Sequence, residues 1–280
     1  MDDTDRVPQL LDAAEHGQAA REAPLRPRVI HELVREEGEK ELRRSWDALA
    51  WSGLSAGLSM GFSFLGLSLL QAGLPDTPWR HLIASAGYSA GFVIVILGRQ
   101  QLFTESTLTA VLPVLTNRTL QILLATLRLW AIVLVTNLIG TFIFAALISP
   151  EGIFAGPVRH SLLGVARESV SGAFGPTLLK SVLAGWLIAI MVWLLPNARA
   201  ARLFLIIFVT YLVSLGSFSH IIAGSTEAAF AVFNGEASVL DYIRGFMLPT
   251  LIGNVIGGVS LVAILNHAPV AIELQERQDD

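Results

Sequence analysis

The chain has 280 residues, of which 53% are hydrophobic and only 15% charged, and its mean hydropathy is +0.60. Because soluble domains carry about 25% charged residues, this composition predicts an integral membrane protein. The formal net charge is only −4 and cysteine is absent, which excludes disulfides and thiolate metal sites. We expect no nucleic-acid partner.

The polar start of the chain is predicted to hold a disordered tail over residues 1–25 and an amphipathic cytoplasmic helix over residues 26–47. Its apolar residues follow helical spacing among dense mixed charges; they are Val29, Ile30, Leu33, Leu42, Trp46 and Leu49. A passive collar is favoured over a gate. Residues 267–280 are predicted to form a C-terminal tail.

Six apolar stretches are long enough to cross about 30 Å of hydrocarbon, which takes roughly 20 helical residues. Four of them are continuous and lie near 48–70, 119–148, 177–196 and 245–266; two others, near 81–113 and 201–233, are interrupted by polar residues. We therefore predict an all-α transmembrane domain over residues 48–266, with six helices in the lipid bilayer.

An even number of crossings places both termini on one side of the membrane. Positive residues gather before the first span and in the loops on that side: Arg6, Arg21, Arg26, Arg28, Arg35, Lys40, Arg43, Arg44, Arg118, Arg199 and Arg202. The opposite loops hold Arg80, Arg159, Arg167 and Arg244. Because Lys and Arg are retained on the cytoplasmic side, both termini are predicted to be cytoplasmic.

Polar breaks interrupt two apolar runs, "FVIVILGRQQLFTESTLTAVLP" (92–113) and "LVSLGSFSHIIAGSTEAAFAVF" (212–233). Non-helical backbone at membrane depth costs several kcal/mol for each unpaired N–H or C=O group, so it persists only where protein or a water-filled cavity receives it. We therefore interpret the breaks as the lining of a pathway, rather than as packing kinks at Gly98 and Gly216.

A short internal repeat relates the two halves of the chain. "TNLIGTF" (136–142) matches "GNVIGGV" (253–259), which pairs Asn137 with Asn254 and lays residues 102–106 on residues 219–223. Each half has three spans, an odd number, so the second half is inverted relative to the first. Paired broken helices in such a 3+3 inverted repeat usually place the substrate path at the repeat interface.

Polar side chains in the two breaks are the candidates for the centre of the path. His220 is the one histidine expected near the middle of the bilayer, where it can donate a hydrogen bond or a proton to an anion. Thr104 offers a hydroxyl in the other break. Glu105 is expected either to face the path or to cap the second half-helix, and Arg99 either faces the cytoplasmic mouth or pairs with Glu105.

Aromatic and aliphatic residues near the breaks are candidates for narrow apolar constrictions, namely Tyr88, Phe92, Leu102, Phe103 and Phe218. Lys180 and Arg167 are candidate cations of an external vestibule. The alternative for Lys180 is a side chain that extends to the membrane surface.

Motifs of enzymes and metal sites are missing from the sequence. It has no His-Glu-x-x-His pair and no Gly-x-x-x-x-Gly-Lys motif. The strings "GLSAG" and "GLSMG" (53–61) lie inside an apolar span and indicate close helix packing, not a nucleophile. We expect neither enzymatic activity, nor a bound metal, nor a cofactor.

Several motifs together resemble the formate/nitrite transporter family over residues 30–266: "LFTESTLT", the histidine break, "NLIG" and "LIGNVIGG". The charged N-terminal helix is similar to the YfdC-like inner-membrane branch of that family. The resemblance implies an aquaporin-like fold, a homopentamer with one pore per protomer, and passage of small monovalent anions across the bacterial inner membrane. It also implies that Thr104 and His220 are the central pore residues.

The chain departs from the family pattern at three positions. "GSFSH" replaces the usual Gly-Phe-Glu-His, Gly185 stands where the fourth span usually brings an asparagine, and the outer lysine has no clear counterpart.

The predicted function is a channel or transporter for small monovalent anions of the formate or nitrite type. In this prediction the anion passes His220 between apolar constrictions, either alone or together with a proton. The alternatives are a neutral small-solute or water channel, and a non-transporting membrane scaffold or stress regulator.

Overall fold

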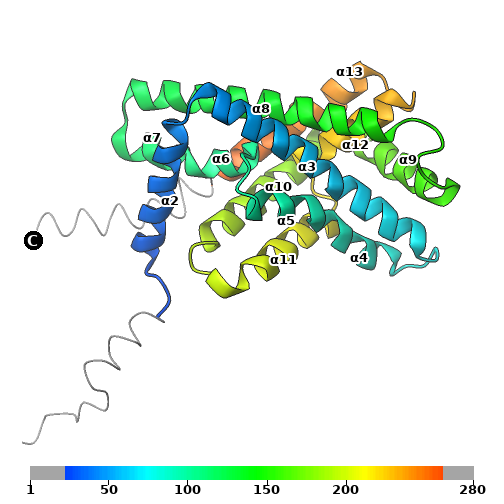
Figure 1. Cartoon of the computed structure of the whole chain (residues 1–280), viewed down its shortest axis with the longest axis horizontal. Coiled ribbons are helices and arrows are strands. Elements are labelled where there is room, and N and C mark those ends of the chain that lie inside the picture. Colours follow the sequence, from blue (N-terminus) through cyan, green and yellow to red (C-terminus); the bar gives the residue numbers. More distant parts are fainter. Residues whose placement is uncertain (1–22, 261–280) are drawn as a thin grey trace, which may run out of the picture.

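The computed structural model describes residues 23–260, and every regular element within that range is a helix (Figure 1). Five helical segments are long and apolar enough to cross a membrane. Three are single helices, α3 (Trp46–Gly73), α8 (Leu120–Ile148) and α10 (Phe174–Leu194). The others are Arg80–Leu97, made of α4 (Arg80–Ala84), η1 (Ser85–Tyr88) and α5 (Ser89–Leu97), and Val239–Ser260, made of α13 (Val239–Asp241), η3 (Tyr242–Met247) and α14 (Leu248–Ser260). The chain is therefore an all-α integral membrane protein.

Both predicted breaks fall where helices stop. The first separates α5 from α6 (Phe103–Thr109) and α7 (Val111–Asn117), and the second separates α11 (Arg202–Leu215) from α12 (Ile221–Phe233). α12 has 13 residues, about 20 Å of helix, which is shorter than the hydrocarbon layer. The predicted crossing at 201–233 is thus two short helices rather than one long one.

Two elements at the ends of the molecule complete the fold. α9 (Gly156–Val170) lies at the end opposite α2 (Pro27–Leu42) (Figure 1), and was not predicted because its sequence has no long apolar run. η2 (Arg199–Ala201) precedes α11.

α2 and α3 are separate helices joined at residues 43–45, so the predicted amphipathic helix over 26–47 ends earlier than expected. The predicted tails lie mostly outside the described residues.

Two helix pairs, α3 with α8 and α10 with α14, make the most extensive contacts in the fold. Glycines line both contacts. A Cβ added at Gly57 of α3 would lie 2.1 Å from the backbone oxygen of Asn137, and one at Gly185 of α10 would lie 2.4 Å from that of Asn254. The small residues of "GLSAG" and "GLSMG" therefore let two helix backbones approach closely, as predicted.

This close approach makes Gly57 intolerant of a side chain. We expect Gly57→Val to destabilise the protein by about 1–3 kcal/mol or more, because the neighbouring backbone cannot move aside as a side chain can. Gly73→Val, at the end of the same helix, is the matched control because a Cβ there meets nothing within 4 Å. Thermal unfolding in detergent measures both, and equal melting temperatures would contradict the prediction.

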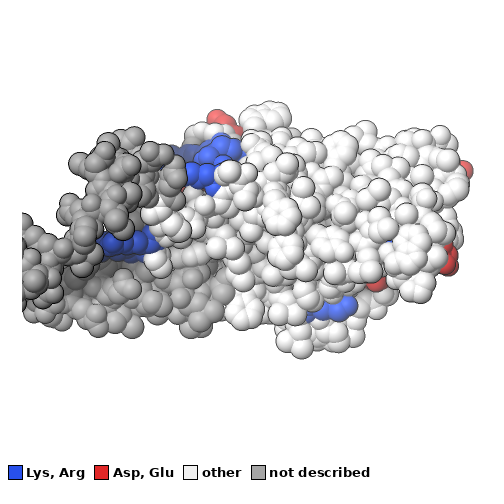
Figure 2. Space-filling model, turned by 90° about the horizontal axis from the view of Figure 1, so that it is seen from below, with Lys and Arg blue, Asp and Glu red and all other residues white. Residues whose placement is uncertain are grey.

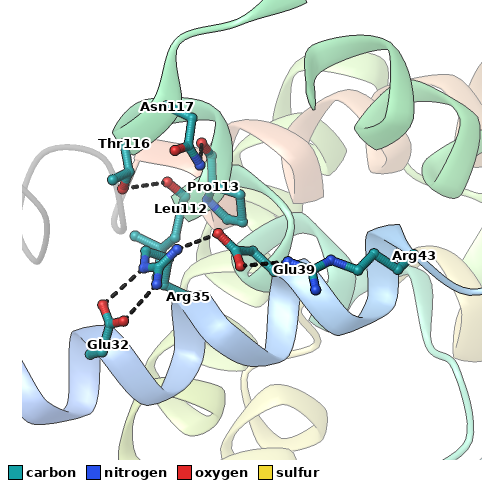
Figure 3. A network of polar contacts seen from close by, with 8 residues as sticks. All are labelled: Glu32, Arg35, Glu39, Arg43, Leu112, Pro113, Thr116 and Asn117. Atoms are coloured by element: carbon teal, nitrogen blue, oxygen red, sulfur yellow. Dashed lines mark hydrogen bonds and ion pairs between the residues drawn. The ribbon is translucent and has the colours of Figure 1, made fainter. Parts of the chain in front are cut away.

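α2 carries its own chain of ion pairs along one face (Figure 3). Arg35 pairs with Glu32 at 2.6 Å and with Glu39, and Glu39 pairs with Arg43 at 3.2 Å. Residues three and four apart are neighbours on a helix, so these pairs support the polar face of α2, while Ile30, Val34 and Leu42 on its other side are buried. Pro27 suits the first helical position, where a missing N–H costs nothing.

Hydrogen bonds also fix the end of α2 against the membrane domain. Arg128 of α8 donates to the backbone oxygens of Leu42 at 2.9 Å and of Arg44 at 3.1 Å. Arg44 in turn donates to the side-chain oxygen of Gln101, in the first break, at 2.8 Å. α2 is thereby held at one end of the broken helices.

The exterior has a large uncharged area (Figure 2). Among the described residues, large apolar side chains such as Trp51, Leu124, Leu179 and Phe204 are exposed. Such an area would be unstable in water but is expected where lipid or another protomer covers it.

Candidate functional site

The two broken helices end in the same backbone motif. Gly98 and Gly216 are each followed by a residue in the left-handed region, Arg99 at φ 50° and Ser217 at φ 48°. The next N–H groups, of Gln100 and Phe218, bond to the carbonyl oxygen five residues earlier, at 3.0 and 2.9 Å. This is the six-to-one hydrogen bond of a Schellman motif, which ends a helix and turns the chain away.

Asn137 of α8 holds the first break open. Its Oδ1 accepts the N–H of Phe103 at 2.9 Å, and its Nδ2 donates to the carbonyl oxygens of Gly53 at 2.7 Å and Gln101 at 3.0 Å. One fully buried side chain thus satisfies two backbone groups of the break that would otherwise be unpaired at membrane depth, and gives a carbonyl within α3 a second partner.

Asn254 of α14 does the same in the second break. Its Oδ1 accepts the N–H of Ile221 at 2.8 Å, and its Nδ2 donates to the carbonyl oxygens of Ser181 at 2.8 Å and Ser219 at 2.9 Å. Two asparagines far apart in sequence therefore play equal parts, which gives the repeated Asn-x-Ile-Gly motif a physical reason.

The register of the repeat differs from the prediction by one residue. The asparagines match as predicted, but the amides that they bind belong to Phe103 and Ile221. Residues 102–106 therefore correspond to residues 220–224, not to 219–223. Leu102 and His220 are the equivalent positions, and each precedes the first turn of its half-helix in an extended conformation.

His220 and Thr104, the two predicted central residues, are in direct contact. The Nε2 atom of His220 lies 2.8 Å from Oγ1 of Thr104, and both residues are buried. Nδ1 of His220 accepts the N–H of Ala223 at 3.2 Å and so caps α12. A neutral imidazole with an accepting Nδ1 carries its proton on Nε2, so the ring donates to Thr104.

This arrangement leaves the hydroxyl proton of Thr104 free. Within residues 23–260 this hydroxyl has no acceptor, because the contact to His220 uses its oxygen as the acceptor. The pair therefore presents one unused O–H donor at the junction of the two half-helices, where an anion could receive it.

Aromatic rings cover the same junction. Phe92 meets the ring of His220 edge-on at a centroid distance of 5.0 Å, and Tyr88 lies 5.5 Å from Phe92. Phe103 instead packs against Trp130 at 6.1 Å. Of the five predicted constriction residues, Tyr88 and Phe218 line a cavity, whereas Phe92, Leu102 and Phe103 lie in the packed interior.

A cavity of about 160 Å³ opens from His220 toward the α9 end of the molecule. We name it the outer cavity, following the predicted orientation. Its lining includes Lys180, which places one of the two predicted vestibule cations in the same space as His220. Arg167 does not line this cavity: it makes a two-pronged contact with Glu236, at 2.6 and 2.7 Å. Sequence alone could not place the partner, which is 69 residues away.

A second cavity, of about 450 Å³, lies at the α2 end and is named the inner cavity. Arg99 and Glu105 both line it, together with residues of α2. Glu105 makes no cap to its half-helix, and its buried Oε1 has no hydrogen-bond partner. Arg99 pairs with Glu37 of α2 at 2.9 Å and not with Glu105, as one alternative had it.

Glu41 of α2 lies at the edge of the inner cavity, where it accepts a hydrogen bond from Thr109 at 2.5 Å. Burial raises the pKa of the Glu41 carboxyl above its usual range and Glu37 raises it further, while Thr109, Gln101 and Arg44 oppose the shift. A raised pKa means that the folded state binds more protons than the unfolded one, so the stability contributed by this group falls as pH rises.

We therefore expect α2 to be held most firmly below the ordinary pKa of a glutamate and to loosen as pH rises through the raised value. Hydrogen exchange of the α2 amides, corrected for intrinsic rates, measures this across pH. Glu41→Gln keeps an acceptor for Thr109 and should remove the dependence, whereas the exposed Glu36→Gln should not. Wild-type exchange that does not respond to pH would contradict the expectation.

Two further features bear on what the site can do. Within residues 23–260 no group of three or more His, Asp or Glu side chains is arranged to hold a metal ion. Gly185, where the family usually has an asparagine, lies against the backbone of Asn254 and has no room for a side chain.

Sequence reasoning missed Glu227. This residue of α12 is 91% buried and lines the outer cavity with His220. The signal was present, because a single carboxyl group interrupts an apolar helix seven residues after His220, and an acid at membrane depth is a functional candidate by default.

The formate/nitrite transporter family model matches residues 28–268 of the chain. Inner membrane protein YfdC of Escherichia coli (strain K12) is 41% identical over 255 residues, which cover 91% of this chain and 82% of YfdC. Formate channel BtFdhC of Bacillus thuringiensis is 24% identical over 250 residues, which cover 87% of this chain and 95% of that channel.

Solved structures show the same fold at lower identity. A pentameric formate channel with formate bound matches with a TM-score of 0.67 at 20% identity, covering 86% of this chain and 99% of the channel. An ion channel of the same family matches with a TM-score of 0.70 at 19% identity, covering 87% and 98%. The matching family is one of transporters, and BtFdhC and both solved structures are channels rather than enzymes. The family model matches most of this chain, and the chain folds with paired broken helices. This chain therefore belongs to the formate/nitrite transporter family.

Proposed function

We propose that the chain forms a channel for small monovalent anions of the formate or nitrite type, in which each anion passes the Thr104–His220 pair. The observation that carries the proposal is the position of this pair. His220 lines the outer cavity, while Glu105, the residue after Thr104, lines the inner cavity. The Thr104–His220 pair thus lies between the two cavities, and a solute that moves from one cavity to the other would pass alongside it.

The chemistry of the pair suits an anion. The free hydroxyl of Thr104 donates to an anionic oxygen, and a hydrogen bond to a charged acceptor is worth about 1.5–3 kcal/mol. Phe92 presses on the ring of His220, so little water accompanies the solute there. Such an apolar site excludes fully hydrated ions and favours an anion that is small or accompanied by a proton.

Six crossings in an aquaporin-like 3+3 inverted repeat are the topology that we assign to this channel. The matched Schellman motifs, the matched bonds of Asn137 and Asn254, and the matched contacts of Gly57 and Gly185 support it. In this topology α11 and α12 together form the fifth crossing, with the break at the level of His220.

We further assign the protein to the bacterial inner membrane as a homopentamer with both termini in the cytoplasm. The solved pentameric formate channel, the inner membrane relative and the exposed apolar surface support this assignment. Lys180 would then attract anions into the outer cavity from the external side, because it lines that cavity and has no ion-pair partner among residues 23–260.

Formate uptake into proteoliposomes, at pH 5 and pH 7, tests the function with His220→Asn beside the wild type. The asparagine Oδ1 replaces Nδ1 as the cap of α12 but leaves no group at the position of Nε2. We expect the wild type to carry formate and the variant to lose about 10- to 100-fold of the flux, because nothing then donates to the Thr104 oxygen and holds the Thr104 hydroxyl in place for its bond to the anion. His160→Asn, at an exposed position, is the control.

Other outcomes would redirect the assignment. Equal formate flux in wild type and His220→Asn would contradict the central role of the histidine. Swelling of the vesicles in glycerol or urea without formate flux would favour the neutral-solute channel. Well-folded protein that carries none of these solutes would favour the non-transporting scaffold.

A further inference from the structure

Glu227 is the one acidic residue of α12, and its environment is unusual for a carboxyl group. The side chain is 91% buried, yet it makes no hydrogen bond or ion pair with any residue in the range 23–260. It lines the outer cavity. A carboxylate without a counter-charge is costly to keep in apolar surroundings, and a proton removes that cost. A buried carboxyl group with a purely structural role would be paired with a hydrogen-bond donor or a cation.

The position of Glu227 along α12 places it on the path to His220. His220, Gly224 and Glu227 all line the outer cavity, at the i, i+4 and i+7 spacing of one helix face. Seven residues correspond to about 10 Å of helix, so Glu227 stands two turns further out than the histidine. Gly224, between them, adds no side chain to the wall.

Charged and titratable groups from four other elements also line the outer cavity: His81 of α4, Tyr88 of η1, Glu168 of α9 and Lys180 of α10. His81 faces the backbone oxygen of Leu215 at 3.3 Å, and no ion pair joins Glu227 to Lys180. Glu168 is exposed and repels Glu227 as a like charge. None of them neutralises Glu227, so a proton is its available counter-charge.

We propose that Glu227 is the proton carrier of the outer cavity and that it converts each entering anion to its neutral acid before the anion reaches His220. In the step, the O–H bond of the Glu227 carboxylic acid breaks and an O–H bond to the anion forms, which gives the neutral solute and a Glu227 carboxylate. A proton from the external solution then restores the acid. This proposal rests on the proposed function.

The substrate class follows from this step. The pore accepts conjugate bases of weak acids, such as short carboxylates, because these can hold the proton while they pass the apolar contact of Phe92 with His220. Anions of strong acids, such as chloride, cannot take the proton and stay outside. Each anion crosses with one proton, so transport is electroneutral.

Glu227→Gln in proteoliposomes tests the proposal, because glutamine has the same size but cannot donate a transferable proton. We expect formate flux at acidic external pH to fall about 100-fold, the usual contribution of a positioned proton donor. Its pH profile should then match that of protein-free vesicles, which measure diffusion of the free acid. Glu168→Gln, which removes a carboxyl from the same cavity, is the control and should retain acid-stimulated flux close to that of the wild type, because Glu227 can still give up its proton.

Three results would overturn the proposal: Glu227→Gln flux that equals or exceeds wild-type flux, chloride flux comparable to formate flux in the wild type, or formate flux that builds up a membrane potential. If the wild type carries formate in a His220-dependent way, any of these results contradicts Glu227 alone. If the wild type shows no His220-dependent formate flux, the proposed function is contradicted. The role of Glu227 as proton carrier is then contradicted as well.

Infrared difference spectroscopy gives a readout that does not need flux. Adding formate at constant pH should shift the carboxylic acid C=O stretch of reconstituted wild type, because formate in the outer cavity accepts a hydrogen bond from the Glu227 acid that the external solution keeps protonated. The signal should be missing in Glu227→Gln and present in Glu168→Gln. A wild-type spectrum without this change would count against the proposal even if the variant folded poorly.

Discussion

Thr104→Val should abolish most of the anion flux while leaving the shape of the site nearly unchanged. Valine has the size of threonine, but it offers neither the acceptor that Nε2 of His220 now uses at 2.8 Å nor the free O–H donor. Loss of a hydrogen bond to an anion, worth about 1.5–3 kcal/mol, corresponds to roughly a 10- to 100-fold lower flux. The stranded Nε2–H of the buried histidine should also cost about 1–3 kcal/mol of stability.

Two variants separate these effects in the same flux and melting measurements. Thr104→Ser keeps the hydroxyl and should recover most of the flux. Thr126→Val removes another buried hydroxyl, which donates to the backbone of Ala110 at 3.3 Å, and should lower stability without reducing flux. Thr104→Val flux equal to that of the wild type would show that the hydroxyl does not touch the anion.

The position of the breaks could be predicted from the sequence because two local rules act there. Apolar runs of about 20 residues show where the chain crosses the bilayer, and a polar interruption inside such a run demands a special environment. Thr104 and His220 were found this way, and the structure brings them into contact across 116 residues of chain.

Side-chain partners were harder to predict because they depend on which helices pack together. Arg99 had two plausible roles in the sequence, but its partner Glu37 lies on α2, whose docking no local pattern reveals. Arg167 looked free for the same reason until Glu236 was placed beside it. Ion pairs between residues that are distant in sequence leave no local sequence pattern from which they could be predicted.

The register error at the second break has a different cause. The match of "TNLIGTF" with "GNVIGGV" aligns the sequence of α8 with that of α14. It does not align the breaks, because the loops between break and helix can differ in length while the motif stays the same. One additional residue between the break and the asparagine in the first half, relative to the second, went unseen. Only the hydrogen bonds of Asn137 and Asn254 show that Leu102, and not Phe103, is the counterpart of His220.

Replacing either asparagine by aspartate should have the largest effect on stability. Asn137→Asp keeps an oxygen for the N–H of Phe103 but turns a donor into an acceptor that faces the carbonyl oxygens of Gly53 and Gln101. The buried carbonyl of Gln101 loses its partner, at about 1–3 kcal/mol, the carbonyl of Gly53 within α3 loses the second of its two partners, and a carboxylate must be buried or protonated. Polar contacts between membrane helices average only about 0.6 kcal/mol, but those join helices whose backbone is already paired.

Asn254→Asp should destabilise the protein to a similar extent, because its bonds to Ile221, Ser181 and Ser219 match those of Asn137 in number and length. Asn117→Asp, whose side chain bonds only to its own helix, is the control and should melt like the wild type. Equal losses at the two buried sites would support the inverted repeat on energetic grounds. If one site tolerates aspartate, then the two asparagines do not contribute equally to stability. The two halves would then be equivalent in geometry but not in energy.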